Sequence, residues 1–198
     1  MVGLQADSRD RTHRMARPTA FVALLRGINV GGKNKLPMVD LRDMVEDAGG
    51  GEVATYIQSG NVLFEATKAA SKAVVVELER ALEDRLGHPI PVVFRSRADL
   101  EAVIDGNPYP AAAKDPPTVH VGFLAAKPKA ATVGRLDPDR SPDDEFSVLG
   151  REIYLHLPGG VGKTKLTSAY LDKTLGTTVT IRNWKTTLKL AELLAERG

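Results

Sequence analysis

The sequence of 198 residues contains no cysteine, which excludes disulfides and thiolate metal ligands. Aromatic residues are also few, at 5% with a single tryptophan, so the chain has few rings on which nucleic-acid bases can stack. No apolar run approaches the roughly 20 residues of a membrane-spanning helix. The four histidines form no His-x-x-x-His pair of the kind that binds zinc. We therefore expect a cytoplasmic protein with no membrane partner, no metal and no cofactor.

The formal net charge of +2 conceals an uneven distribution of charge. Four arginines lie within residues 1–18, and six lysines and arginines lie within residues 163–189 with a single acid among them. Clustered positive charge favours anionic partners, although a solvated helix face gives the same pattern. Residues 1–18 lack apolar periodicity and the apolar core of a signal peptide, so we predict that they form a disordered extension.

Residues 20–37 carry the most informative local pattern in the chain. The uninterrupted apolar run Phe21–Leu25 is typical of a strand buried on both faces. Three glycines and three cations follow without an acid, and Pro37 stands where a helix accepts proline in its first turn. Such a loop can present backbone N–H groups and positive charge to an anion, or it can be a tight turn in which asparagines satisfy local backbone groups. The candidate ligand-binding residues here are Arg26, Asn29, Lys33, Asn34 and Lys35.

The remainder of the first half follows the order β-α-β-β-α-β. Apolar residues at spacings of three and four, ended by glycines, indicate the helices, and Ser59-Gly60 indicates a hairpin turn. The predicted elements are a helix at 36–48, strands at 53–58 and 61–66, a helix at 71–86 and a strand at 91–95. This order is that of the ferredoxin-like, or split βαβ, unit.

The second half repeats this order with additional helices. Ser96 and Asp99 predict a capping box at the start of a short helix, and Asn183 predicts the cap of the last helix, which ends near residue 195. Between them we predict strands at 118–124, 146–149, 152–157 and 178–181 and helices at 129–136 and 163–175. We therefore predict an α+β fold of two ferredoxin-like (βαββαβ, split βαβ) halves, residues 19–96 and 97–198, the second including the C-terminal helix.

Four segments agree with this two-part organisation. They read ALLRGINVGGKNKLPM, TYIQSGNVLFEA, YLHLPGGVGKTKLTS and TIRNWKTTLKLAEL, and they resemble, in order, the signature blocks of the domain of unknown function 1697 family. The resemblance covers most of residues 20–194. It implies ferredoxin-like halves in a small bacterial cytosolic protein, and it implies no activity, substrate or catalytic residue.

Residues 159–164, Gly-Gly-Val-Gly-Lys-Thr, resemble a phosphate-binding loop between a strand and a helix. Leu157 and Pro158 stand where that motif requires glycine or lysine, and the preceding strand belongs to a hairpin rather than to a parallel sheet. We therefore reject a nucleotide triphosphatase and keep a helix start that binds an anion. The candidate ligand-binding residues here are Gly162, Lys163, Thr164 and Lys165, with Arg182 and Trp184 further along the chain. Trp184 can stack on a ligand ring or serve as a packing anchor.

Three functions follow from these patterns. We predict a binding protein for a phosphate-bearing or other anionic ligand (nucleotide, nucleic-acid backbone or sugar phosphate) where the cationic loops of the two halves come near each other. Sequence-specific RNA recognition on a ferredoxin-like sheet is excluded, because its third strand would carry a single aromatic residue. One alternative is a small-metabolite enzyme that uses His156 as acid or base with Arg26 or Lys163. The other is a protein–protein adaptor with an exposed apolar sheet face.

Overall fold

The computed structural model describes residues 17–114 and 118–197, so nearly all of the predicted N-terminal extension lies outside the described residues. The first half contains β1 (Thr19–Leu25), α1 (Met38–Asp47), β2 (Gly51–Tyr56), β3 (Asn61–Ala66), α2 (Ser71–Leu86) and β4 (Val92–Ser96). The second half contains α3 (Arg97–Asp105), a 3-10 helix (Ala112–Lys114), β5 (Val119–Leu124), α4 (Ala130–Val133), β6 (Glu145–Leu149), β7 (Glu152–His156), α5 (Ser168–Leu175), β8 (Val179–Asn183) and α6 (Trp184–Ala195).

Each half forms a four-stranded antiparallel sheet. The strand orders are β2-β3-β1-β4 and β6-β7-β5-β8, so β1 and β5 are the central strands that pair with the third and fourth strands of their own halves. This is the strand order of the ferredoxin-like unit. The predicted α+β class with two ferredoxin-like halves is confirmed.

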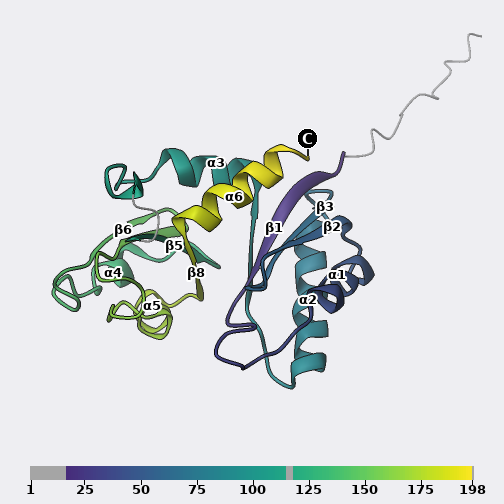
Figure 1. Ribbon diagram of the computed structural model, residues 1–198, viewed down its shortest axis with the longest axis horizontal. Helices are drawn as coiled ribbons and strands as arrows, with labels where there is room; N and C mark the ends of the chain where they lie inside the picture. The colour runs from purple at the N-terminus through teal and green to yellow at the C-terminus, as the bar shows by residue number, and fades with distance from the viewer. Residues whose placement is uncertain (1–16, 115–117, 198) are drawn as a thin grey trace, which may run out of the picture.

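The two sheets enclose a shared apolar core. α1 and α2 lie on the outer side of the first sheet and α4 and α5 beside the second, while α3 and α6 run next to each other between the halves (Figure 1). Ala20, Val22 and Leu24 point from β1 into the central cluster, which also holds residues of β5, α3 and α6. The alternate β1 residues, beginning with Phe21, belong to the outer core under α1 and α2. Burial on both faces explains why β1 is apolar throughout.

Side-chain caps determine where several helices begin. Ser96 and Asp99 form the predicted capping box, with Asp99 N donating to Ser96 Oγ at 3.2 Å and Ser96 N donating to Asp99 Oδ2 at 2.8 Å. Asn183 caps α6, as predicted. The predicted helix start at residue 163 is wrong, because Thr167 is the N-cap of α5 and accepts a hydrogen bond from Tyr170 N. Helix α4 is shorter than predicted and is followed by Gly134, which has a low helix propensity.

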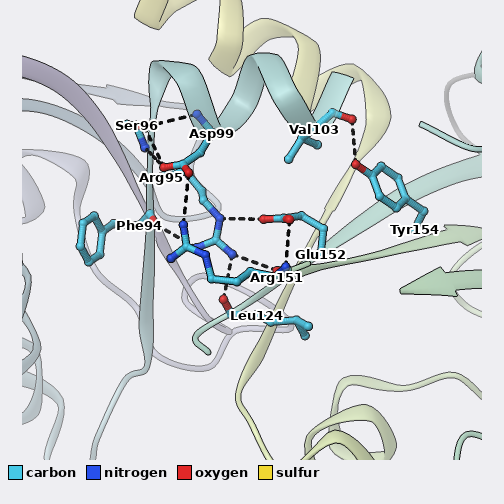
Figure 2. A network of polar contacts seen from close by, with 9 residues as sticks. All are labelled: Phe94, Arg95, Ser96, Asp99, Val103, Leu124, Arg151, Glu152 and Tyr154. Carbon is cyan, nitrogen blue, oxygen red and sulfur yellow. Dashed lines mark hydrogen bonds and ion pairs between the residues drawn. The ribbon is translucent and has the colours of Figure 1, made fainter. Parts of the chain in front are cut away.

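In each half, one buried arginine on the last strand makes hydrogen bonds with the other half. Arg95 on β4 is 1% exposed and donates from Nε to Glu152 Oε1 at 2.9 Å. Its Nη2 donates to the carbonyls of Leu124, at the end of β5, and Arg151, in the β6–β7 turn. Figure 2 shows this network. The contacts join the first sheet to the central strand and the hairpin of the second.

Arg182 on β8 makes the reciprocal contacts with the first half. It donates to Asn61 Oδ1 at 2.6 Å, to Leu25 O at the end of β1, and to Gly60 O in the β2–β3 turn. Asn61 stands where the other half has Glu152, so Arg182 has an amide partner in place of a carboxylate. Burial lowers the pKa of Arg182 to about 10, which leaves it charged at neutral pH. The two halves are therefore linked by two symmetry-related arginines.

Candidate functional site

The asparagines of the 26–36 loop hold the loop in shape. Asn29 Nδ2 donates to the carbonyls of Leu36 and Gln58, both at 2.9 Å, and Asn29 Oδ1 accepts from Leu36 N. Asn34 Nδ2 donates to Gly27 O at 3.0 Å. Both asparagines have positive φ, 55° and 49°, a conformation that asparagine tolerates better than most residues. Their side chains are thus used within the loop.

Three other predicted site residues are also engaged within the protein. Arg26 forms an ion pair with Asp172 on α5, and Arg182 is the buried link between the halves described above. Trp184 is 4% exposed and packs in the central core at the start of α6. The tryptophan therefore has the surroundings of a packing anchor.

Unlike the predicted site residues described above, the lysines of the two loops are exposed to solvent. Lys33, Lys35, Lys163 and Lys165 are all exposed, and none forms an ion pair within the part of the chain that the structure describes. The loops therefore carry four cations without a described counter-charge.

The two loops also share the pattern Gly-Lys-Asn/Thr-Lys-Leu, at residues 32–36 and 162–166. The leucines, Leu36 and Leu166, are each 2% exposed and anchor their loops in the outer cores. The loops do not occupy equivalent places in the repeat, because the first follows β1 and the second follows β7. Duplication of the half therefore does not account for the shared pattern. This repetition was visible in the sequence and was missed.

A hollow of about 380 Å³ opens beside the first loop. We call it the loop hollow, and it is lined by Asn29, Gly32, Lys35, Leu36, Pro37, Met38 and Gln58. All of these residues belong to the first half, and residues 159–165 are not part of its lining. Arg26, at the base of the first loop, contacts the helix that follows the second loop. The base of the first loop is thus joined to α5 of the second half, while the hollow belongs to the first loop alone.

Ile57 is the unusual residue next to the loop hollow. It immediately precedes the lining residue Gln58, its φ is +50° and it is 49% exposed. A positive φ is a genuine outlier for a β-branched residue, and such strain costs about 1–3 kcal/mol and clusters at functional sites. Val30 in the facing loop is 61% exposed. Strain and exposed apolar surface thus occur together beside a cationic hollow.

His156, the proposed acid or base, lies in a separate cluster. Its Nδ1 is 3.0 Å from Glu145 Oε1 across the β6–β7 pair, and its ring centroid lies 5.7 Å from that of Tyr109. Burial, helped by the charge of Glu145, raises the pKa of Tyr109 to about 12. The described contacts of His156 do not include Arg26 or Lys163, the partners proposed from sequence.

Tandem ferredoxin-like halves joined by reciprocal arginines define the structural class of this protein. The family model of proteins of unknown function DUF1697 matches residues 19–154, so the chain belongs to that family, as its sequence blocks indicated. The structure of the conserved bacterial protein SP0830 from Streptococcus pneumoniae is similar, with a TM-score of 0.71 and 26% sequence identity. That similarity covers 90% of this chain and 99% of the other. Comparison with curated proteins finds no match. Among the described helices, none is long and apolar enough to cross a membrane.

Proposed function

We propose that this protein binds a phosphate-bearing small molecule in the loop hollow. The observation that carries the proposal is the exposed, backbone-strained Ile57 beside a concave surface lined by Lys35. Backbone strain of this kind clusters at ligand-binding and active sites, and asparagine or glycine would relieve it at this position. Packing of a ligand against the isoleucine side chain compensates for the strain.

The chemistry of the hollow favours a ligand with one anionic and one less polar part. Lys35 lines the hollow and Lys33 follows the lining residue Gly32. Neither lysine forms an ion pair among the described residues, which suits a phosphate group. Met38 and Pro37 offer apolar surface to a ring or sugar, and the exposed Ile57 directly precedes the lining residue Gln58. A volume of about 380 Å³ is at the small end of ligand pockets. A mononucleotide or a sugar phosphate fits these requirements.

The second loop extends the proposal to longer anions. Lys163 and Lys165 repeat the exposed pair of the first loop, and the Arg26–Asp172 ion pair connects the base of the first loop with α5, the helix that follows the second loop. A mononucleotide in the hollow is then held by the first loop alone, whereas an oligonucleotide backbone reaches both. Binding of the longer ligand falls more steeply with salt, because more phosphates are neutralised.

Calorimetric titration of the full chain with adenosine monophosphate, ribose 5-phosphate and a short single-stranded oligonucleotide tests the proposal. The variant Lys33→Ala/Lys35→Ala weakens mononucleotide binding about tenfold, which corresponds to about 1.4 kcal/mol. Lys127→Ala/Lys129→Ala is a matched control, since these exposed lysines have the same spacing, and it leaves binding unchanged. Equal losses of mononucleotide affinity in both variants would show that binding depends only on the net charge of the protein, and this would refute a site at the hollow.

A further inference from the structure

A second and larger cavity lies at the opposite end of β1 from the loop hollow. Its volume is about 740 Å³, within the range of small-molecule sites. It is lined by the start of β1, the start of α2, the junction of β4 with α3, the β6–β7 turn and the end of α6. The seven residues of β1 separate it from the loop hollow by about 20 Å at 3.4 Å per residue. Figure 1 shows these two ends of β1. We call it the junction pocket.

Positive charge predominates in the junction pocket. Its lining includes five cations and two carboxylates, which are Lys68, Lys72, Arg97, Arg151, Arg197, Asp99 and Glu101. Both carboxylates have partners, because Arg151 pairs with Asp99 at 3.2 Å and Arg97 pairs with Glu101 at 2.7 Å. Lys68 and Lys72 are exposed and form no ion pair among the described residues. The two lysines therefore remain available to an external anion.

The floor of the junction pocket is apolar. Phe21 and Phe94 line it, and their rings meet edge to face with centroids 6.1 Å apart. Leu194 from α6 and Ala20 from β1 add aliphatic surface. Edge-to-face ring pairs are a favourable aromatic arrangement, and a half-buried Phe94 leaves ring surface for a third apolar group.

One wall of the junction pocket is held rigidly by the network around Arg95. Asp99 accepts from Ser96 N and Ser96 Oγ, and it pairs with Arg151 (Figure 2). Burial acts to raise the pKa of Asp99, but the hydrogen bonds from Ser96 and the charge of Arg151 outweigh it and keep the pKa below its ordinary value. Asp99 is therefore ionised and committed to the wall. A preorganised wall lowers the entropic cost of ligand binding.

We infer that the junction pocket binds an amphipathic organic anion, with its carboxylate, sulfonate or phosphate at Lys68 and Lys72 and its flat or aliphatic body against Phe21 and Phe94. The inference is independent of the loop hollow, because the two sites share no lining residue. Elements of both halves form the pocket, so the ligand also stabilises the junction between them.

Two fluorescent probes of the same shape test this inference on the full chain. 8-Anilinonaphthalene-1-sulfonate carries a sulfonate on an aromatic body, and N-phenyl-1-naphthylamine has the same body without the charge. Lys68→Ala/Lys72→Ala weakens sulfonate binding about tenfold, the scale expected from losing one or two charge-assisted contacts at a half-open site, and leaves the neutral probe unchanged. Phe94→Ala weakens both probes.

The control separates a site at the junction pocket from general effects of charge. Lys127→Ala/Lys129→Ala, two exposed lysines outside both cavities, leaves the sulfonate affinity unchanged, and thermal unfolding checks that every variant is folded. Sulfonate binding that survives the Lys68→Ala/Lys72→Ala change, or that falls equally in the Lys127→Ala/Lys129→Ala variant, overturns the inference without affecting the proposal for the loop hollow.

Discussion

Replacement of Arg182 by methionine tests how the two halves are held together. Arg182 is 8% exposed and donates five hydrogen bonds, to Asn61 Oδ1 and to the carbonyls of Leu25, Ser59, Gly60 and Ile181. Methionine preserves much of the volume and removes every donor. Asn61, at 0% exposure, then loses the partner of its amide oxygen.

The expected loss of stability follows from two opposing terms. A buried acceptor left without its donor costs about 1–3 kcal/mol, and the Arg182→Met change leaves at least two, on Asn61 and Leu25. Removing a buried guanidinium that has no carboxylate partner among residues 17–114 and 118–197 regains part of this stability, because its desolvation is unfavourable. We therefore expect a net loss of about 3 kcal/mol in the free energy of unfolding.

Urea unfolding followed by Trp184 fluorescence and by far-ultraviolet circular dichroism measures the effect. The ring of Trp184 is buried and lies two residues beyond the substitution, so it reports on the junction. Arg80→Met is a matched control, because the Arg80 side chain is 73% exposed and its loss costs less than about 0.5 kcal/mol. A loss below about 1 kcal/mol for Arg182→Met, or separate transitions for the two probes in the wild type, would refute the reasoning.

Three further predictions have defined outcomes. Gly60→Ala lowers the free energy of unfolding, measured in urea, by more than Gly87→Ala does. Both glycines have positive φ, but a Cβ at Gly60 would lie 2.8 Å from Leu25 Cβ, whereas a Cβ at Gly87 would meet nothing within 4 Å. The Gly87 change costs about 1–2 kcal/mol for the backbone alone, and equal losses would contradict the packing argument. Ile57→Asn leaves the unfolding free energy unchanged or raises it by up to about 1 kcal/mol while weakening mononucleotide binding; a clear loss of stability would show that the residue is structural. Asp99→Asn reduces the acid sensitivity of the fold. The folded-state pKa of Asp99 lies below its ordinary value of 3.8, so its contribution to stability is complete well above that pH and is lost as the pH falls through the lower folded value. If the urea midpoint of the Asp99→Asn variant fell as much between pH 5 and pH 3 as that of the wild type, this prediction would be contradicted.

Local sequence signals predicted the elements well where one residue dominated the choice. The capping box of Ser96 and Asp99 and the cap at Asn183 are such signals, because a side chain satisfies a backbone N–H only a few residues away. The predicted start of α5 was wrong because the glycine and lysine pattern at 159–165 resembles a helix start, whereas Thr167 is the residue that caps the helix.

The candidate site was less accessible to sequence reasoning. The roles of Arg95 and Arg182 depend on which strand ends face each other between the halves, and no local pattern specifies that arrangement. The positive φ of Ile57 is likewise invisible, since its sequence neighbours predict a continuous strand to residue 58. The junction pocket draws its lining from segments between Pro18 and Arg197, a combination that only the folded chain brings together.

Amide chemical-shift mapping of the full chain with adenosine monophosphate tests the central claim most directly. Binding in the loop hollow predicts saturable shifts within residues 29–38 and 57–60, which disappear in the Lys33→Ala/Lys35→Ala variant. Shifts confined to residues 68–72 and 94–99, or the absence of any saturable shift, would contradict a phosphate-binding site at the first loop.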